Sequence, residues 1–203
     1  MTNFLLIRHG MNDAVGKVLA GRLQGLSLNT EGRFQADKLA LRLAGLPISA
    51  IYSSPLERAI ETAEPLAKIL HLKNIIMNEF TDLQYGEWTN RKIDELESSS
   101  HFRQFNQFRS FCRIPGGESM LEAQYRMISG MEKLFIKHTQ EMIAIVTHAD
   151  LIKSAVAYYA GIHLDMFHRI EISPASVSWI GVDEHSARIF LLNDSGEIKP
   201  ERI

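Results

Sequence analysis

Two histidines and two arginines, far apart in the sequence, are of the residue types that could act together on one anionic group. They are Arg8, His9, Arg58 and His148. Two guanidinium groups can clamp a tetrahedral dianion and neutralise the charge that spreads over a phosphoryl group during its transfer. A neutral imidazole nitrogen can attack phosphorus and form a covalent phosphohistidine. The set therefore predicts phosphoryl-transfer chemistry, with a carboxylic acid nearby to protonate the leaving alkoxide.

Arg58 follows a good helix start and carries a separate argument. Ser54 is expected as the N-cap and Pro55 as the first helical residue, with Glu57 completing a capping box. Arg58 then lies in the first turn, where the positive end of the helix dipole disfavours a cation. Either it pairs with Glu61 on the surface, or it binds an anion such as phosphate together with the helix start. Arg8 on a neighbouring strand end favours the second interpretation.

The elements that must position these side chains alternate along the chain. Short apolar runs predict strands at 4–7, 49–53, 74–77, 142–146, 177–182 and 187–192. Helical spacing predicts helices at 30–43, 55–70, 119–137 and 151–159, with Pro65 expected to kink or split the second. This order predicts a three-layer α/β/α sandwich with a mostly parallel central sheet. Ligands of such folds bind at the carboxyl ends of the strands, where all four side chains are expected.

Length and composition restrict the class of protein. The chain has 203 residues and a net charge of −2, which predicts a single domain over 1–203 and gives no electrostatic reason to expect nucleic acid as a partner. Its single cysteine, Cys112, excludes an internal disulfide and a multi-cysteine zinc site. No apolar run approaches the roughly 18 residues of a membrane span, and no signal peptide is evident. We therefore expect a cytoplasmic protein without a membrane partner.

Several blocks of the sequence carry a family resemblance. In order, these are Phe4–Gly10, Gly21–Gly25 with Leu28–Gly32, Tyr52–Ala59, Gly86–Trp88, Pro115–Ser119 and Val146–Ala149. Together they resemble the histidine phosphatase superfamily, which includes the cofactor-dependent phosphoglycerate mutases. The resemblance implies a phosphoglycerate mutase-like fold and a metal-independent reaction without a cofactor. It also implies that His9 is the phosphorylated nucleophile and that Arg8, Arg58 and His148 form the phosphate pocket.

The resemblance further implies a general acid and several substrate contacts. The expected acid is Asp82, where relatives most often have glutamate, and Glu79, Glu87 and Asp150 remain rivals. Val15 occupies a position where many relatives have a substrate-contacting asparagine, for which Asn12 is a candidate replacement. The expected substrate-binding residues are Asn12, Gln24, Gly25 and Ala149.

Three other functions compete with phosphomonoester hydrolysis. A phosphoglycerate mutase would need more cations around the pocket mouth than this short chain supplies, so hydrolysis is favoured. A non-catalytic phosphate-binding or regulatory module would be expected to have lost one of the histidines or arginines. A zinc site made by His9, His148 and Asp82 is disfavoured because Arg8 and Arg58 would repel a dication. We therefore expect a small-molecule phosphomonoester as the binding partner, and we leave a homodimer open.

The segment 83–118 is a candidate lid or cap. Within it, the stretch 101–113 has phenylalanines at every third residue from 102 to 111 and contains three arginines. One interpretation is a core-facing stripe with a solvated basic face. The other is a lid that offers apolar walls and a cation to the distal part of the substrate, with Gly116 and Gly117 as flexible residues.

Overall fold

Six strands form one mixed sheet in the order β3-β2-β4-β1-β5-β6. The computed structural model describes residues 1–196. The strands are β1 (Thr2–Arg8), β2 (Ile48–Ser53), β3 (Asn74–Ile76), β4 (Met142–Thr147), β5 (Val177–Val182) and β6 (Ala187–Asp194). The first four strands are mutually parallel, and β5 and β6 continue the sheet in antiparallel fashion. The predicted strands and the mostly parallel sheet are confirmed.

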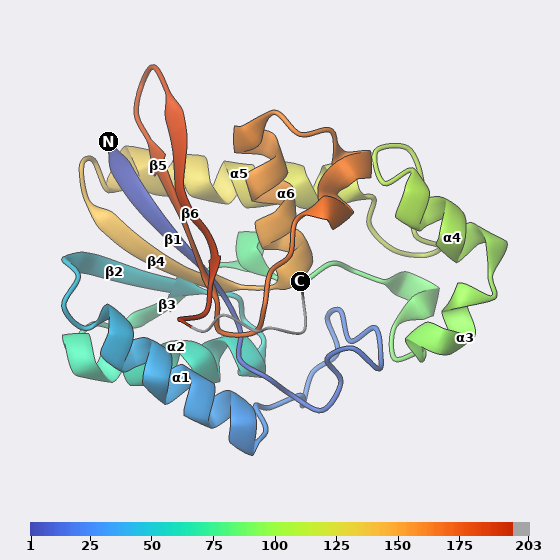
Figure 1. Ribbon diagram of the computed structural model, residues 1–203, viewed down its shortest axis with the longest axis horizontal. Helices are drawn as coiled ribbons and strands as arrows, with labels where there is room; N and C mark the ends of the chain where they lie inside the picture. The colour runs from blue at the N-terminus through green and yellow to red at the C-terminus, as the bar shows by residue number, and fades with distance from the viewer. Residues whose placement is uncertain (197–203) are drawn as a thin grey trace.

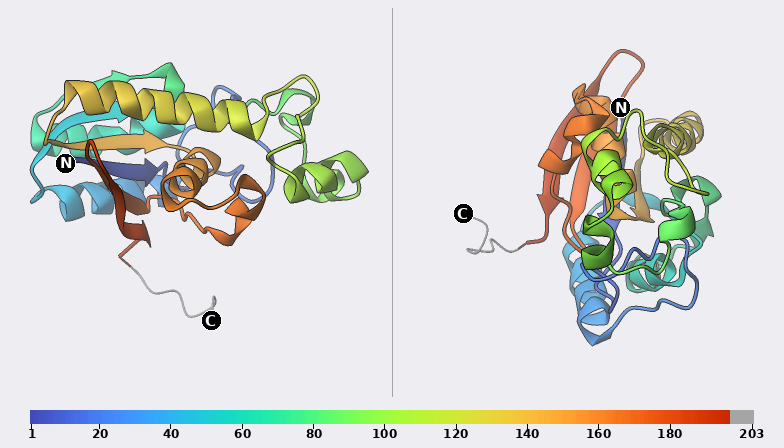
Figure 2. Two further views of the ribbon diagram at one scale, coloured as in Figure 1. Left: turned by 90° about the horizontal axis from the view of Figure 1, so that it is seen from above. Right: turned by 90° about the vertical axis from the view of Figure 1, so that its right-hand side faces the viewer.

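Helices cover both faces of this sheet (Figures 1 and 2). One face carries α1 (Thr30–Leu43) and α2 (Glu57–Leu70), and the other carries α5 (Met120–Lys137) and α6 (Ala149–Ala160). Two short helices, α3 (Ile93–Glu97) and α4 (Ser100–Gln107), lie to one side, and three 3-10 turns complete the structure: η1 (Asn78–Phe80), η2 (Gly86–Trp88) and η3 (Leu164–Arg169). The three-layer prediction is thus confirmed. Within residues 1–196, no helix combines the length and apolarity needed to cross a bilayer.

The central strands are apolar on both sides because each side packs against helices. In β1, Phe4 and Leu6 belong to the core under α5 and α6, whereas Leu5 and Ile7 belong to the core under α1 and α2. All four side chains are at most 1% exposed. A run of consecutive apolar residues is what a parallel strand with two covered faces requires.

Strand register brings the carboxyl ends of three strands together. Arg8 at the end of β1 lies opposite Thr147 at the end of β4, and Ser53 at the end of β2 lies opposite Val146. The backbone N–H of His9 then donates to the Thr147 carbonyl at 3.0 Å. The residues that follow these three strands therefore share one edge of the sheet.

Pro65 does not split α2, which runs from Glu57 to Leu70 as one helix. Proline at this position cannot donate to the carbonyl of Glu61, four residues earlier. Both residues are partly exposed, so this carbonyl lies near solvent, where the loss of the helical hydrogen bond is tolerated. The predicted interruption is therefore not found.

The two ends of the segment 83–118 lie close together. Its two ends are joined by hydrogen bonds from Glu87 N–H to the Pro115 carbonyl at 3.0 Å and from Glu118 N–H to the Gln84 carbonyl at 2.9 Å. Gly86, with φ +47°, permits this contact, because a Cβ there would lie 2.1 Å from the Pro115 oxygen. Whether the segment moves as a lid stays a prediction.

The phenylalanine stripe of this segment is only half buried. Phe102 and Phe105 on α4 are at most 6% exposed, whereas Phe108 and Phe111 are 51% and 85% exposed. The helix ends at Gln107, so helical spacing no longer applies beyond it and the last two rings face solvent. The stripe does not continue as a single core-facing surface.

Candidate active site

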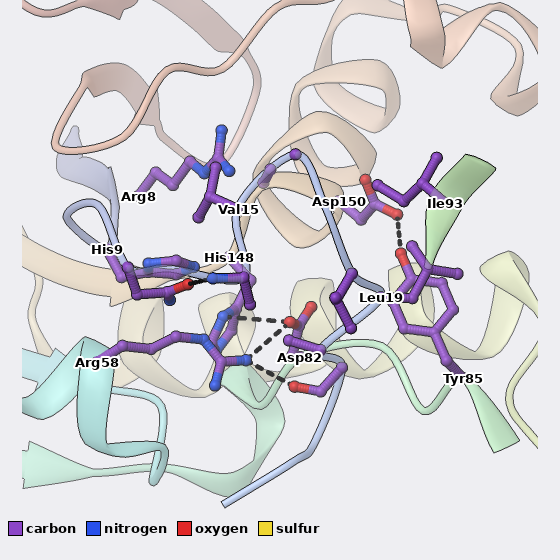
Figure 3. A pocket seen from close by; sticks show the side chains of 17 residues that line it. Arg8, His9, Val15, Leu19, Arg58, Asp82, Tyr85, Ile93, His148 and Asp150 are labelled. Carbon is purple, nitrogen blue, oxygen red and sulfur yellow. Dashed lines mark hydrogen bonds and ion pairs between the residues drawn. The ribbon is translucent and has the colours of Figure 1, made fainter. Parts of the chain in front are cut away.

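The carboxyl ends of the strands bring both predicted histidines into one pocket (Figure 3). His9 follows β1 and His148 follows β4, and their ring centroids are 5.2 Å apart. Arg58 enters from the first turn of α2, and Asp82 enters from the loop after η1. All four side chains line the same cavity.

His9 is buried and held in one orientation by its own loop. Its Nδ1 lies 2.7 Å from the carbonyl oxygen of Gly10. A carbonyl only accepts hydrogen bonds, so Nδ1 carries the proton and the lone pair is on Nε2. Burial lowers the pKa of His9 well below its usual value, and the charges of Arg58 and Arg8 lower it further. His9 is therefore neutral and has a nucleophilic nitrogen, and the predicted carbonyl partner near the Arg8–Gly10 turn is found.

His148 lies next to His9 and is also neutral. It is 1% exposed, and its Nε2 lies 2.8 Å from the Ser54 hydroxyl oxygen. Its Nδ1 is 3.4 Å from Asp82 Oδ2 and has no hydrogen bond among the described residues. Burial and then the charge of Arg58 lower the pKa of His148 well below its usual value. A dianion bound in the pocket would oppose both effects, so His148 can become a donor when phosphate binds.

Arg58 is completely buried, and loop carbonyls fix its side chain. Its Nη2 donates to the Gly21 carbonyl at 2.6 Å and to Asp82 Oδ2 at 3.0 Å. Its Nε has no partner among the described residues. A buried guanidinium N–H without a protein partner is suited to bind an anionic ligand.

The helix start before Arg58 differs from the prediction. The N-cap of α2 is Leu56, with no side-chain cap, and the helix begins at Glu57. Ser54 contacts His148, and its hydroxyl accepts only a weak 3.3 Å bond from Leu56 N–H. The Glu57 carboxylate accepts from Gly25 N–H at 3.0 Å instead of closing a capping box. Ser54 and Glu57 thus bind residues distant in the sequence instead of capping the helix, although Arg58 still lies in the first turn.

Arg8 lines the pocket on the other side of His9 from Arg58 (Figure 3). Its Nη1 donates to the Ile172 carbonyl at 2.6 Å, which fixes the side chain. Its charge lowers the pKa of both His9 and His148. The two predicted arginines therefore flank the nucleophile.

Asp82 has the environment of a proton donor. Oδ2 is bonded to Arg58, and Oδ1 accepts from Leu83 N–H at 2.8 Å. Burial raises the pKa of Asp82, the charge of Arg58 opposes this, and the nearby charge of Asp150 adds to the rise. A raised carboxyl pKa increases the protonated fraction of Asp82 at any given pH, which suits a general acid.

Two of the three rival acids lie outside the pocket lining. Glu79 forms an ion pair with Lys133 at 2.6 Å, and Glu87 is exposed. Asp150 does line the pocket, but its pKa is lowered because Arg109 and Lys153 outweigh the effect of burial. This geometry favours Asp82.

The predicted substrate-binding residues divide into two pairs. Asn12 and Ala149 line the pocket, and Asn12 Oδ1 also accepts from Ala14 N–H at 3.0 Å. Gln24 and Gly25 do not line it, because Gly25 turns toward Glu57 on the outer side of the loop.

Two arginines matter to the site in ways that the sequence did not indicate. Arg126 on α5 donates to the carbonyls of Glu79, Thr81 and Asp82 at 2.8, 2.5 and 3.0 Å, so it holds the loop that carries Asp82. Arg109, expected on a solvated basic face or against the substrate, is buried and paired with Asp150 at 3.1 Å. Nothing local marks either contact, because the partners are distant in the sequence.

Within residues 1–196, no three histidine, cysteine or acidic side chains are grouped so that they could hold a metal ion. The cavity, of about 230 Å³, instead brings together a neutral nucleophile, two guanidinium groups and a carboxyl group of raised pKa. These are the components of phosphoryl transfer to nitrogen followed by hydrolysis.

Comparisons with known proteins agree with this chemistry. A family model described as "Histidine phosphatase superfamily (branch 1)" matches residues 4–195. The chain is 27% identical over 198 residues to Phosphoserine phosphatase 1 of Hydrogenobacter thermophilus, covering 95% of this chain and 92% of the relative. It is 26% identical over 183 residues to a 2,3-bisphosphoglycerate-dependent phosphoglycerate mutase of Thermoplasma acidophilum, covering 88% and 86%. The solved structure of Bacillus stearothermophilus YhfR superposes with a TM-score of 0.89 at 26% identity, covering 96% of this chain and 98% of that one.

Proposed function

The chain belongs to the histidine phosphatase superfamily, and from this premise we propose that it hydrolyses small phosphomonoesters through a phosphorylated His9, with Asp82 as the proton donor. One observation carries this proposal: the unprotonated Nε2 of a buried His9 is flanked by Arg8 and Arg58 in a pocket that also contains Asp82. The proposed reaction uses neither a metal ion nor a cofactor.

The first half of the reaction transfers the phosphoryl group to the enzyme. His9 Nε2 forms a bond to phosphorus while the bond from phosphorus to the ester oxygen breaks. The protonated Asp82 carboxyl group gives its proton to that oxygen, so an alcohol leaves rather than an alkoxide. Arg8, Arg58 and His148 stabilise the charge on the three remaining oxygens.

The second half returns the enzyme to its starting state. Asp82, now a carboxylate, takes a proton from a water molecule, whose oxygen attacks phosphorus. The bond from phosphorus to Nε2 breaks, inorganic phosphate leaves, and Asp82 is again protonated. Each proton that Asp82 donates is thus recovered in the same cycle.

Replacing the nucleophile tests this function. His9→Ala is expected to lower kcat/KM for para-nitrophenyl phosphate by about 10³-fold or more, because no other described group can accept the phosphoryl group at that position. The wild-type enzyme should also yield an acid-labile phosphoenzyme with a radiolabelled substrate, and the variant should yield none.

His185→Ala is the matched control, because His185 lies exposed in the turn between β5 and β6, away from the pocket. It should retain the wild-type rate and the phosphoenzyme. Activity of His9→Ala at several per cent of the wild-type rate would contradict the assignment of the nucleophile.

We further propose that residues 83–118 act as a cap on the substrate pocket and that the protein works in the cytoplasm on a small molecule. Tyr85 and Ile93 of this segment line the cavity, and a β-bridge joins Val18 in the pocket wall to Lys92, which supports the first part. A single cysteine in 203 residues suits a reducing compartment, which supports the second. A homodimer stays a prediction that sedimentation would check.

A further inference from the structure

The pocket has a second half, beyond the phosphate-binding side chains, in which only one residue is charged. Most of this half is formed by small or apolar residues of the loop 14–21, together with Ile93 and Ala149. Among the lining residues, all of which the structure describes, the only cations are Arg8 and Arg58 of the phosphate centre. The one charged group of the distal half is Asp150.

Asp150 lines the pocket, and only one of its two carboxylate oxygens accepts hydrogen bonds from the described residues. It is the second residue of α6, and both of its hydrogen bonds fall on Oδ2, from the Tyr85 hydroxyl at 2.9 Å and from Arg109 Nη1 at 3.1 Å. No described residue donates to Oδ1, and the side chain is 18% exposed. Figure 3 shows this oxygen turned away from Tyr85. A carboxylate oxygen without a donor at a pocket wall is an acceptor site for a ligand.

Arg109 fixes this carboxylate as an anion. Its guanidinium carbon lies 4.4 Å from the ring centroids of both Phe105 and Phe167. One ring comes from α4 and the other from η3. Its Nη2 donates to Asn106 Oδ1 at 2.8 Å and its Nε to His168 Nε2 at 3.1 Å. These contacts hold the guanidinium in place against Asp150.

We propose that Asp150 Oδ1 binds an ammonium or hydroxyl group on the organic part of the substrate, so that the enzyme selects short phosphomonoesters that carry such a donor and discriminates against those with a second anionic group. This inference rests on the proposed phosphatase function. Asp150 follows His148 by two residues, so their Cα atoms are at most about 7 Å apart. We therefore expect a short organic body, of two or three carbons, to join the two sites.

The same charge arrangement explains which substrates would be excluded. A carboxylate or second phosphate in the distal half would face Asp150, and no cation of the lining would remain to compensate it. A charge-assisted hydrogen bond from an ammonium group to Oδ1 would instead be favourable in a site of low polarity. The selectivity follows from one side chain and the apolar walls around it.

Two nearly isosteric substrates test the inference directly. O-phosphoethanolamine and 2-phosphoglycolate both have two-carbon bodies, with an ammonium group and a carboxylate respectively. We expect kcat/KM to be at least about ten-fold higher for phosphoethanolamine, the effect of one charge-assisted hydrogen bond, with ethyl phosphate between them. Equal or better hydrolysis of phosphoglycolate would overturn the inference.

Two variants separate ligand binding from a merely structural role. Asp150→Asn is expected to reduce the ratio of kcat/KM for the two substrates to within about three-fold, because a neutral amide no longer distinguishes their charges. Tyr85→Phe removes a hydrogen bond to Oδ2 but leaves the Asp150 charge, so it should keep the wild-type ratio. If both variants lower all rates together and leave the ratio unchanged, Asp150 is structural and the inference is wrong.

Para-nitrophenyl phosphate distinguishes the failure of this inference from the failure of the proposed function. If it is hydrolysed while the two-carbon substrates show no preference, the phosphatase assignment holds and the role of Asp150 does not. If the wild-type protein hydrolyses none of these esters, the proposed function fails, and this inference fails with it.

Discussion

Two arginine–aspartate pairs each place a carboxyl group in the pocket lining, and the pKa values of the two carboxyl groups are shifted in opposite directions. Arg58 contacts Asp82 at 3.0 Å, and Arg109 contacts Asp150 at 3.1 Å. The pKa of Asp82 is nevertheless raised, whereas that of Asp150 is lowered. An ion pair alone therefore does not determine the protonation of a buried acid.

The surroundings of the two pairs account for the difference. Asp82 lies close enough to Asp150 for that negative charge to add to the effect of burial. Asp150 has Lys153 nearby and the Tyr85 hydroxyl as a second donor, and these add to the effect of Arg109. In the proposed mechanism, the first acid exchanges a proton during the reaction, while the second stays ionised. The division of roles between them can be tested by breaking each pair in turn.

The largest expected effect comes from Asp82→Asn. The amide cannot donate a proton to a leaving alkoxide, so kcat for an alkyl phosphate should fall by about 10²–10⁴-fold. The fall should be much smaller for para-nitrophenyl phosphate, whose leaving group departs without help. Initial rates on ethyl phosphate and para-nitrophenyl phosphate measure the difference.

Asp150→Asn is the comparison variant for this experiment. It should change the two rates by similar factors, because Asp150 does not protonate the leaving group. If Asp150→Asn shows the strong dependence on the leaving group and Asp82→Asn does not, the assignment of the two acids is reversed.

The next effect is on stability rather than on rate. Arg109→Leu leaves the Asp150 carboxylate buried without its cation, which should lower the free energy of unfolding by about 3–5 kcal/mol. Urea denaturation followed by circular dichroism measures this. Arg113→Ala breaks an exposed pair with Glu122 instead and should cost at most about 1 kcal/mol. A similar cost for both variants would show that Arg109 is not an anchor.

A smaller effect is expected from the residue that holds the Asp82 loop. Arg126→Lys keeps the positive charge but loses several of the hydrogen bonds to the loop carbonyls, so it should slow ethyl phosphate hydrolysis by roughly ten-fold. Para-nitrophenyl phosphate should be affected less, because Arg126 acts through the position of the proton donor. An equal loss on both esters would indicate general destabilisation instead.

The smallest effect is in the pH dependence of stability, where the two acids should differ in sign. The raised pKa of Asp82 means that the folded state binds its proton first, so stability gains as the pH falls toward the usual value of 3.8. The lowered pKa of Asp150 contributes stability that is present above this value and is lost as the pH falls through the folded pKa.

Urea unfolding at a series of pH values from neutral to acidic checks these signs. Asp82→Asn should make the loss of stability on acidification steeper, and Asp150→Asn should make it shallower near the acidic end. Both variants share the loss caused by His9 and His148, whose lowered pKa values make the unfolded state bind protons first below the usual 6.5. Parallel curves for the two variants would remove the proposed distinction.

The sheet and the phosphate centre could be predicted from the sequence because their signals are local. Four consecutive apolar residues at Phe4–Ile7 mark a strand that is buried on both faces, and Arg8 and His9 follow directly. Asn29 caps α1 through its side chain, at the predicted start of that helix. Strand ends in a parallel sheet meet at one edge, so the convergence of His9 and His148 followed from the fold class.

The contacts of the distal half could not be predicted, because they join distant parts of the chain. Arg109 and Asp150 are 41 positions apart, and the aromatic rings on the guanidinium come from α4 and η3. Ser54 was expected as a helix cap but contacts His148, 94 positions away. Local propensity cannot reveal such exchanges, since the competing partner appears only after folding.

The closed ends of residues 83–118 make this segment exchangeable. Hydrogen bonds among Gln84, Glu87, Pro115 and Glu118 tie its ends together. A change in the length of chain between them therefore need not change how the segment joins the rest of the fold. Doubling the length of such a loop costs only about 0.6 kcal/mol of closure entropy. Grafting a different segment at these points, with Arg109 and the rings that contact it retained, would therefore give a way to redirect the enzyme to other alcohols while His9 and its arginines stay in place.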